Sequence, residues 1–153
     1  MANILKAAEM IRNAFSVVAL TGAGASTESG IPDFRSSGGS FGKAQKYDIP
    51  AEVMLSHSFF IRHTETFYDY YKNNLLYPDA KPNECHNALA ELESLCNFGE
   101  VITQNIDGLH QKAGSSNVIE LHGTTARNYC MKCRKSYDMG YICEAKTLVP
   151  TCE

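Results

Sequence analysis

A short apolar run followed at once by closely spaced glycines constrains the fold of this chain more than any other feature. Residues 17–21 read VVALT and lead directly into Gly22 and Gly24. An apolar run of this length is typical of a strand buried in a parallel sheet. Two glycines after such a strand permit a tight turn that brings main-chain N–H groups close to a phosphate. On its own, the loop is compatible with nucleotide binding and with a plain strand-to-helix turn.

The glycine loop departs from the dinucleotide motif of dehydrogenases. Thr27 stands where the third glycine of G-x-G-x-x-G would be, and no acidic residue ends a second strand about 20 residues further on. A hydride-transfer dehydrogenase is therefore a minor alternative. The following "IPDFR" offers an acid, an aromatic ring and a bidentate cation in Asp33, Phe34 and Arg35. These residue types suit a ribose or phosphate, and they also suit a surface turn with a local ion pair.

Apolar periodicity predicts strands that alternate with helices. The predicted helices cover 3–15, 56–76 and 83–96, with Asn83 as a cap, and the predicted strands cover 17–21, 101–103 and 118–121, with a short helix between the last two. A glycine- and serine-rich loop is expected over 31–46. Such alternation implies a parallel sheet. Three parallel strands with two open edges are unusual, so we expect the first part of a longer domain.

Polar side chains follow the second and third predicted strands. Gln104, Asn105 and Asp107 offer amide and carboxylate groups for sugar hydroxyls or a carboxamide, although Asn105 or Asp107 would equally well cap the next helix. His122 ends the third strand, and a histidine there can act as a general base on a hydroxyl. Ligands of parallel sheets bind outside the carboxyl ends of the strands, which favours a catalytic role for His122.

Three cysteines in the last part of the chain have the spacing of a zinc site. Cys130 and Cys133 form a C-x-x-C, and Cys152 follows after 18 intervening residues. This matches three ligands of a motif with two C-x-x-C pairs about 15 to 20 residues apart. Zinc held by four thiolates is structural, because no coordination position stays open.

The other three cysteines are weaker candidates. Cys143 is a possible substitute for the fourth zinc ligand, although its neighbour Ile142 suggests that it is buried. Cys85 and Cys96 lie on a predicted helix and are expected to be small buried side chains.

Composition indicates an ordinary globular protein. The chain has 153 residues, 44% of them hydrophobic, and a net charge of −3, which favours neither a nucleic-acid nor a membrane-surface footprint. We see no secretory signal and no run of about 20 apolar residues. The expectation is a cytoplasmic protein with no membrane partner and no direct nucleic-acid partner.

Four motifs in one order resemble those of a known family. "GAGASTESGIPDFR", "TQNIDGLH", "LHG" and C-x-x-C together resemble the sirtuins, the NAD-dependent protein deacylases, from about Val17 to Cys152. The resemblance implies an α/β fold: a Rossmann-like parallel sheet, incomplete here, over 1–123, with an inserted zinc-ribbon module over 124–153. It implies NAD as cofactor and a structural zinc on Cys130, Cys133 and Cys152.

The resemblance also implies a role for each motif residue. The cofactor loop would comprise Gly22, Ala23, Gly24 and Thr27, with Asp33, Phe34 and Arg35 near the reacting ribose. The residues that frame the ribose and the nicotinamide amide would be Gln104, Asn105, Ile106 and Asp107, with Asn105 catalytic. His122 would be the general base. Ala23, Ile31, Phe34 and Ile106 would form a dry pocket around the reacting carbon.

The reaction implied is removal of an acyl group from lysine in a protein or peptide. The acyl oxygen attacks the ribose carbon as nicotinamide leaves, and the products are nicotinamide, O-acetyl-ADP-ribose and free lysine. Relatives that prefer acidic acyl groups carry Tyr-x-x-Arg, whereas this chain has Tyr68-x-x-Tyr71, so acetyl-lysine is the expected substrate. Two alternatives are ADP-ribosyl transfer at the same site and a truncated, non-catalytic zinc-stabilised binding module. The latter arises because the family's fourth zinc ligand and adenosine-binding segments would lie beyond Glu153.

Overall fold

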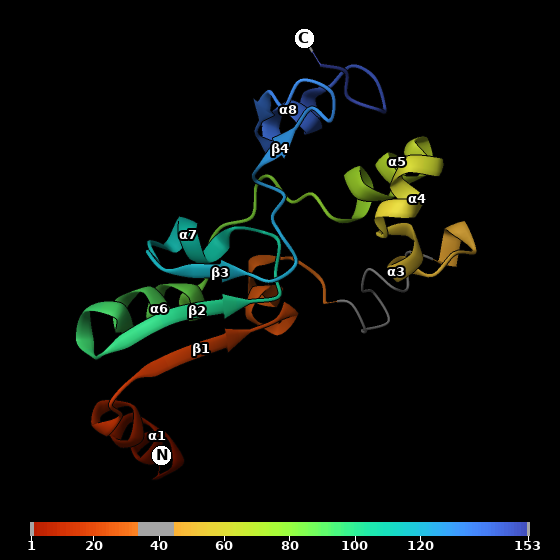
Figure 1. Cartoon of the computed structure of the whole chain (residues 1–153). Helices are drawn as coiled ribbons and strands as arrows, with labels where there is room; N and C mark the ends of the chain where they lie inside the picture. The colour runs from red at the N-terminus through yellow and green to blue at the C-terminus, as the bar shows by residue number, and fades with distance from the viewer. Residues whose placement is uncertain (1, 34–44, 153) are drawn as a thin grey trace.

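The computed structural model describes residues 2–33 and 45–152 and contains a three-stranded parallel sheet (Figure 1). Its strands are β1 (Val17–Thr21), β2 (Phe98–Thr103) and β3 (Val118–Glu120), in the order β1-β2-β3. Thr21 pairs with Thr103, which pairs with Glu120, so the carboxyl ends of all three strands meet at one edge. The predicted strands are confirmed, although β2 begins at Phe98 and not at Val101.

Three predicted helices accompany the sheet: α1 (Ala2–Asn13), α6 (Glu84–Leu95) and α7 (Leu109–Ala113). Asn83 caps α6 as expected, because its side chain accepts a hydrogen bond from the Cys85 N–H at 2.9 Å. The helix α6 packs against both β2 and α7, whereas α1 lies at the opposite end of β1 from the strand's carboxyl end (Figure 1).

The sheet is buried on one face only. Val101 and Thr103 of β2 are buried. Apolar side chains on the other face stay open to solvent, with Val18 51%, Leu20 69%, Ile119 43% and Leu121 54% exposed. The expectation of a fully buried first strand is therefore wrong, because the described residues leave this face uncovered.

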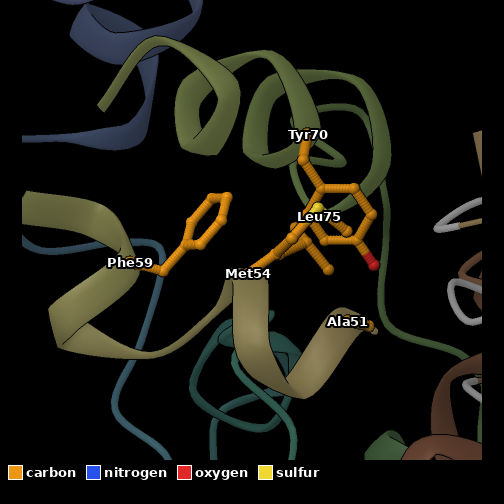
Figure 2. Close-up of a cluster of buried hydrophobic side chains, with 5 residues drawn as sticks. All are labelled: Ala51, Met54, Phe59, Tyr70 and Leu75. Atoms are coloured by element: carbon orange, nitrogen blue, oxygen red, sulfur yellow. The ribbon is translucent and has the colours of Figure 1, made fainter. Parts of the chain in front are cut away.

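A helical region between β1 and α6 contains the main hydrophobic cluster. It begins with a short 3-10 helix, η2 (Gln45–Tyr47), and continues as α3 (Ala51–Met54), α4 (His57–Arg62) and α5 (Thr64–Asn74). The buried side chains of this cluster are Ala51, Met54, Phe59, Tyr70 and Leu75, of which Met54, Tyr70 and Leu75 lie close together (Figure 2). Met54 and Tyr70 have no exposed surface, so this part of the chain holds a core of its own.

The single helix predicted over 56–76 is wrong, because His63 interrupts it. His63 adopts φ −133° and ψ 50°, outside the helical region. The hydroxyl of Thr64 donates to the Phe60 carbonyl at 2.9 Å, a side-chain bond that competes with helical pairing. The break lets α4 and α5 pack against each other, with the rings of Phe60 and Phe67 4.8 Å apart.

The cysteine-bearing part of the chain is small, and its two strands form a sheet of their own. It contains the antiparallel strands β4 (Asn128–Tyr129) and β5 (Ser136–Tyr137), followed by α8 (Met139–Glu144). The side chain of Asp138 caps α8 by accepting from the Tyr141 N–H at 2.8 Å. We find no helix in the described ranges with the length and apolarity needed to cross a bilayer.

Candidate functional site

A hollow lies where the carboxyl ends of the strands face the helices α3 and α5. It has a volume of about 900 Å³ and is lined by residues from the predicted site, namely Ala23, Gly24, Asp33, Gln104, Asn105, Ile106 and His122. Its other wall includes Leu55, Phe67 and Tyr71. The chain thus brings together most of the predicted cofactor residues. Phe34 and Arg35 lie outside the described residues.

A second, smaller cavity of about 40 Å³ adjoins the first, since both are lined by Ala23, Asn105 and Ile106. Ile31 and Asp107, which the sequence also placed near the cofactor, line this smaller cavity as well. Three of the four residues expected in a dry pocket therefore line one cavity, and the fourth, Phe34, lies outside the described ranges.

The glycine loop forms a 3-10 helix, η1 (Ala23–Ser29), which presents its backbone to the hollow. Gly22 and Gly24 have open space where a Cβ would be, so the loop offers room for a ligand beside its main chain. Thr27 is exposed and its hydroxyl donates to the Gly24 carbonyl at 3.0 Å, which stabilises the turn itself. Gly30 ends η1 with φ 81°, a conformation that favours glycine.

Ser26 is the buried centre of the site, and the sequence analysis did not identify it. It is 1% exposed, and its hydroxyl donates to Asp107 Oδ2 at 2.7 Å. The Ser26 Oγ atom also accepts a hydrogen bond from the side-chain amide of Asn105 at 3.0 Å and lies 3.5 Å from His86 Nε2. One serine therefore connects the glycine loop, the segment after β2 and the helix α6.

Asn105 and Asp107 have different structural roles. The amide of Asn105 donates to the Gly22 carbonyl and to Ser26, both at 3.0 Å, so Asn105 joins two strand ends and does not cap a helix. Asp107 Oδ1 accepts from the N–H of Leu109, the first residue of α7, at 2.9 Å, although the N-cap position itself is Gly108. Its other oxygen accepts a hydrogen bond from the Ser26 hydroxyl, so both oxygens of the Asp107 carboxylate are held in place.

His122 is held by the segment after β2. Its Nδ1 lies 3.0 Å from the Gln104 carbonyl oxygen. A carbonyl can only accept, so Nδ1 carries the proton in the neutral ring and Nε2 carries the lone pair. His122 and Gln104 are exposed and line the larger hollow. In this orientation Nε2 is the ring nitrogen that can accept a hydrogen bond or a proton.

Two buried histidines lie beneath the site, and both were missed at the sequence level. The rings of His86 and His110 are 4.8 Å apart, and each residue is at most 1% exposed. His110 Nε2 lies 2.9 Å from the Thr21 hydroxyl. Burial lowers the pKa of His86, with Asp107 opposing the shift. Burial, together with His86, also lowers the pKa of His110, so both rings favour the neutral form.

Acid is expected to destabilise the chain through these two histidines. Their folded pKa lies below the usual value of about 6.5, so the unfolded chain binds more protons as pH falls through that value. Stability from this source is present above about pH 6.5 and is lost below it, by at most about 1.4 kcal/mol per pH unit per histidine. The free energy of unfolding, measured with urea at several pH values, should vary less with pH in His110→Gln than in the unmodified chain. The exposed His57→Gln should keep the original slope, and equal slopes for all three proteins would contradict the assignment.

Three cysteine sulfurs gather in the last part of the chain, as predicted. The Sγ atoms of Cys130, Cys133 and Cys152 all lie within 4.8 Å of one another. Main-chain N–H groups of Cys133 and Lys132 lower the pKa of Cys130 to about 7, which favours the thiolate that a metal binds. In residues 2–33 and 45–152, no fourth histidine, cysteine or carboxylate joins this group.

The remaining cysteines differ from expectation. Cys143 is exposed although the adjacent Ile142 is buried, because neighbouring residues on α8 point in different directions, and it is not a member of the sulfur group. Cys85 is also exposed, in the first turn of α6, and Cys96 is half-buried at its end. The prediction of burial is therefore wrong for Cys85 and Cys143 and holds only in part for Cys96.

The parallel sheet, the glycine loop after its first strand and the polar crevice at the strand ends define an α/β protein of the Rossmann-like class. Residues 22–153 match the model of the Sir2 family. The chain belongs to the Sir2 family, which confirms the resemblance to the sirtuins.

Individual relatives support this assignment. The NAD-dependent protein deacetylase of Clostridium tetani is 54% identical over 145 residues, which are 95% of this chain and 59% of that protein. The Clostridium perfringens deacetylase is 51% identical, over 97% of this chain and 61% of the relative. A solved Sir2 structure with a deacetylated p53 peptide and 3′-O-acetyl-ADP-ribose has a TM-score of 0.84 at 40% identity, covering 98% of this chain and 60% of that one. The chain thus spans about three fifths of the length of the relatives it matches.

Proposed function

We propose that the chain carries the nicotinamide-side and catalytic part of an NAD-dependent protein-lysine deacetylase. The single observation that carries this proposal is the placement of His122, Asn105 and Asp107 around connected cavities at the strand ends. NAD would be consumed, giving nicotinamide, O-acetyl-ADP-ribose and a free lysine. The names of the relatives and the ligands of the solved Sir2 structure support this reaction.

The chain's own residues have distinct tasks in this proposal. The N–H groups and open glycine positions of residues 22–24 receive a phosphate. Asn105 uses its amide hydrogens within the protein, so it presents its carbonyl oxygen to a ribose hydroxyl or a water. The fixed Asp107 carboxylate accepts from the carboxamide of nicotinamide. His122 takes a proton from a ribose hydroxyl at Nε2, the nitrogen that its contact with Gln104 leaves unprotonated.

The wall of the larger hollow supports a neutral acyl group. Tyr71 lines it, and burial, with Tyr68 and Cys143 nearby, raises the pKa of Tyr71 to about 12, so its phenol is uncharged. Glu52 lines the same hollow, and the described lining residues include no lysine or arginine. Among the described residues that line the hollow, an acidic acyl chain would meet a carboxylate and no cation, whereas acetyl carries no charge.

Zinc is part of the same proposal. Cys130, Cys133 and Cys152 would hold one structural zinc ion, since three thiolates within 4.8 Å match the ligand type of such sites. The ion would stabilise residues 124–153 as a zinc-ribbon module and would take no part in the chemistry at the strand ends.

The test is mass spectrometry of the chain incubated with NAD and an acetyl-lysine peptide. We expect loss of the acetyl group together with formation of nicotinamide and O-acetyl-ADP-ribose. A matched peptide that carries a succinyl group should react more slowly, because of Glu52. Addition of ADP-ribose to protein without deacetylation would instead indicate ADP-ribosyl transfer. Absence of both reactions, with no heat on titration of NAD, would indicate a non-catalytic module.

A further inference from the structure

The loop that carries His122 is fastened to the segment after β2 by three bonds in the same order along both segments. The Leu121 N–H donates to the Thr103 carbonyl at 2.9 Å, and the Thr125 N–H donates to the Ile106 carbonyl at 2.9 Å. Between them, Nδ1 of His122 lies 3.0 Å from the Gln104 carbonyl oxygen. The loop therefore runs beside Gln104 and Ile106, which are predicted to contact NAD.

Thr125 donates two hydrogen bonds to the Ile106 carbonyl. Its hydroxyl, like its N–H, donates to the Ile106 carbonyl at 2.9 Å, and the residue is only 3% exposed. A carbonyl oxygen has two lone pairs, and Thr125 therefore supplies donors for both. Valine has nearly the same shape but lacks the hydroxyl, so it would keep the N–H bond and leave one lone pair of the Ile106 carbonyl without a donor.

A salt bridge closes the loop around His122. Glu120 Oε2 lies 2.6 Å from the guanidinium of Arg127, and Glu120 Oε1 accepts from the Gln111 amide at 2.9 Å. The Glu120 side chain is 7% exposed and that of Arg127 is 69% exposed. Because one partner precedes His122 and the other follows Thr125, the pair limits how far residues 121–126 can separate from β3 and α7.

We propose that Thr125, assisted by the Glu120–Arg127 salt bridge, is a positioning residue that fixes the orientation and the tautomer of His122. A neutral imidazole free in water exchanges between two tautomers, and a carbonyl facing Nδ1 selects the Nδ1–H form. The Gln104 carbonyl has this effect only while the loop keeps His122 in place. The inference rests on the proposed function for the claim that His122 is the base, whereas the position of the ring is a property of the chain without any ligand.

The experiment is ¹⁵N NMR of the His122 ring in the chain at pH 8, without NAD or peptide, with the signals assigned through His122→Gln. In the unmodified chain we expect Nδ1 to be protonated and Nε2 to have the shift of an unprotonated nitrogen. Thr125→Val should lower the Nδ1–H population, so that the two ring-nitrogen shifts move toward each other. Thr125→Ser, which keeps the hydroxyl, should restore them. Arg127→Met should produce a smaller change in the same direction.

The control is Thr147→Val, which removes a hydroxyl that donates to the Val149 carbonyl at 2.8 Å, away from the crevice. It should leave the His122 shifts unchanged. Unaltered shifts in a folded Thr125→Val variant would overturn the proposal. If that variant does not fold, unaltered shifts in Arg127→Met, whose side chain is largely exposed, would overturn it equally. The NMR experiment measures no turnover, so a chain without deacetylase activity still tests the position of the His122 ring. Failure of this proposal can therefore be distinguished from failure of the proposed function.

Discussion

His122→Ala is expected to lower the rate of NAD-dependent deacetylation by about 100- to 10,000-fold, the usual contribution of a positioned general base. The ring lines the hollow with Nδ1 engaged by the Gln104 carbonyl, so Nε2 is the only basic atom that His122 can present to a substrate. Alanine removes that atom and leaves the glycine loop and Asp107 intact. Binding of NAD, measured by calorimetric titration, should therefore change little.

Two comparisons make this result specific. His57→Ala removes an exposed imidazole at the start of α4 and should leave deacetylation unchanged. Deacetylation that persists in His122→Ala at the original rate would exclude His122 as the base. Loss of NAD binding in the same variant would show that the ring serves mainly to hold the nucleotide.

Removal of zinc is expected to unfold residues 124–153. Structural zinc sites contribute on the order of 10 kcal/mol to folding in small modules, and this part of the chain has short strands and one short helix to replace that contribution. Cys133→Ser should abolish binding of one zinc ion per chain, as measured by metal analysis of the purified protein. It should also weaken the near-ultraviolet dichroism of the stacked Tyr137 and Tyr141 rings, which lie 4.1 Å apart.

Cys143→Ser provides the matched control. Cys143 belongs to the same small region but lies outside the sulfur group, so this variant should retain its zinc and its tyrosine signal. A Cys133→Ser protein that still carries one zinc ion per chain, or a chelated protein with unchanged melting, would contradict a structural site built on these three thiolates.

Local patterns predicted the elements of this chain better than they predicted its contacts. The strands at 17–21 and 118–120 and the capped helix after Asn83 follow from apolar periodicity and from one side chain that bonds a nearby N–H. The break at His63 depends on how the α4 and α5 side chains pack, which periodicity does not report. The exposed face of β1 was missed for the same reason, since a run of apolar residues does not reveal whether both sides of a strand are covered.

The candidate site was only partly visible in the sequence, because its centre is built from distant residues. Ser26 and Asp107 are 81 positions apart, and Ser26 and His86 are 60 apart. Motifs identified the residues after each strand but not the serine that links them. A signal for His86 was present, because it stands three residues after the cap residue Asn83 and receives the Asn83 N–H at 3.2 Å. No comparable local signal marks Thr125.

The exposed apolar face of the sheet and the crevice at its carboxyl edge are formed by different side chains. Leu20 and Ile119 pair with Ile102 across β2, so their side chains form one continuous apolar surface on the face opposite α6. Continuous exposed apolar surface promotes association between molecules in concentrated solution. The crevice lies at the carboxyl edge of the same sheet and uses other residues. Among the described residues, the apolar side chains of this face and the side chains that line the crevice are therefore separate sets, so a polar substitution at Leu20 changes the first without altering the second.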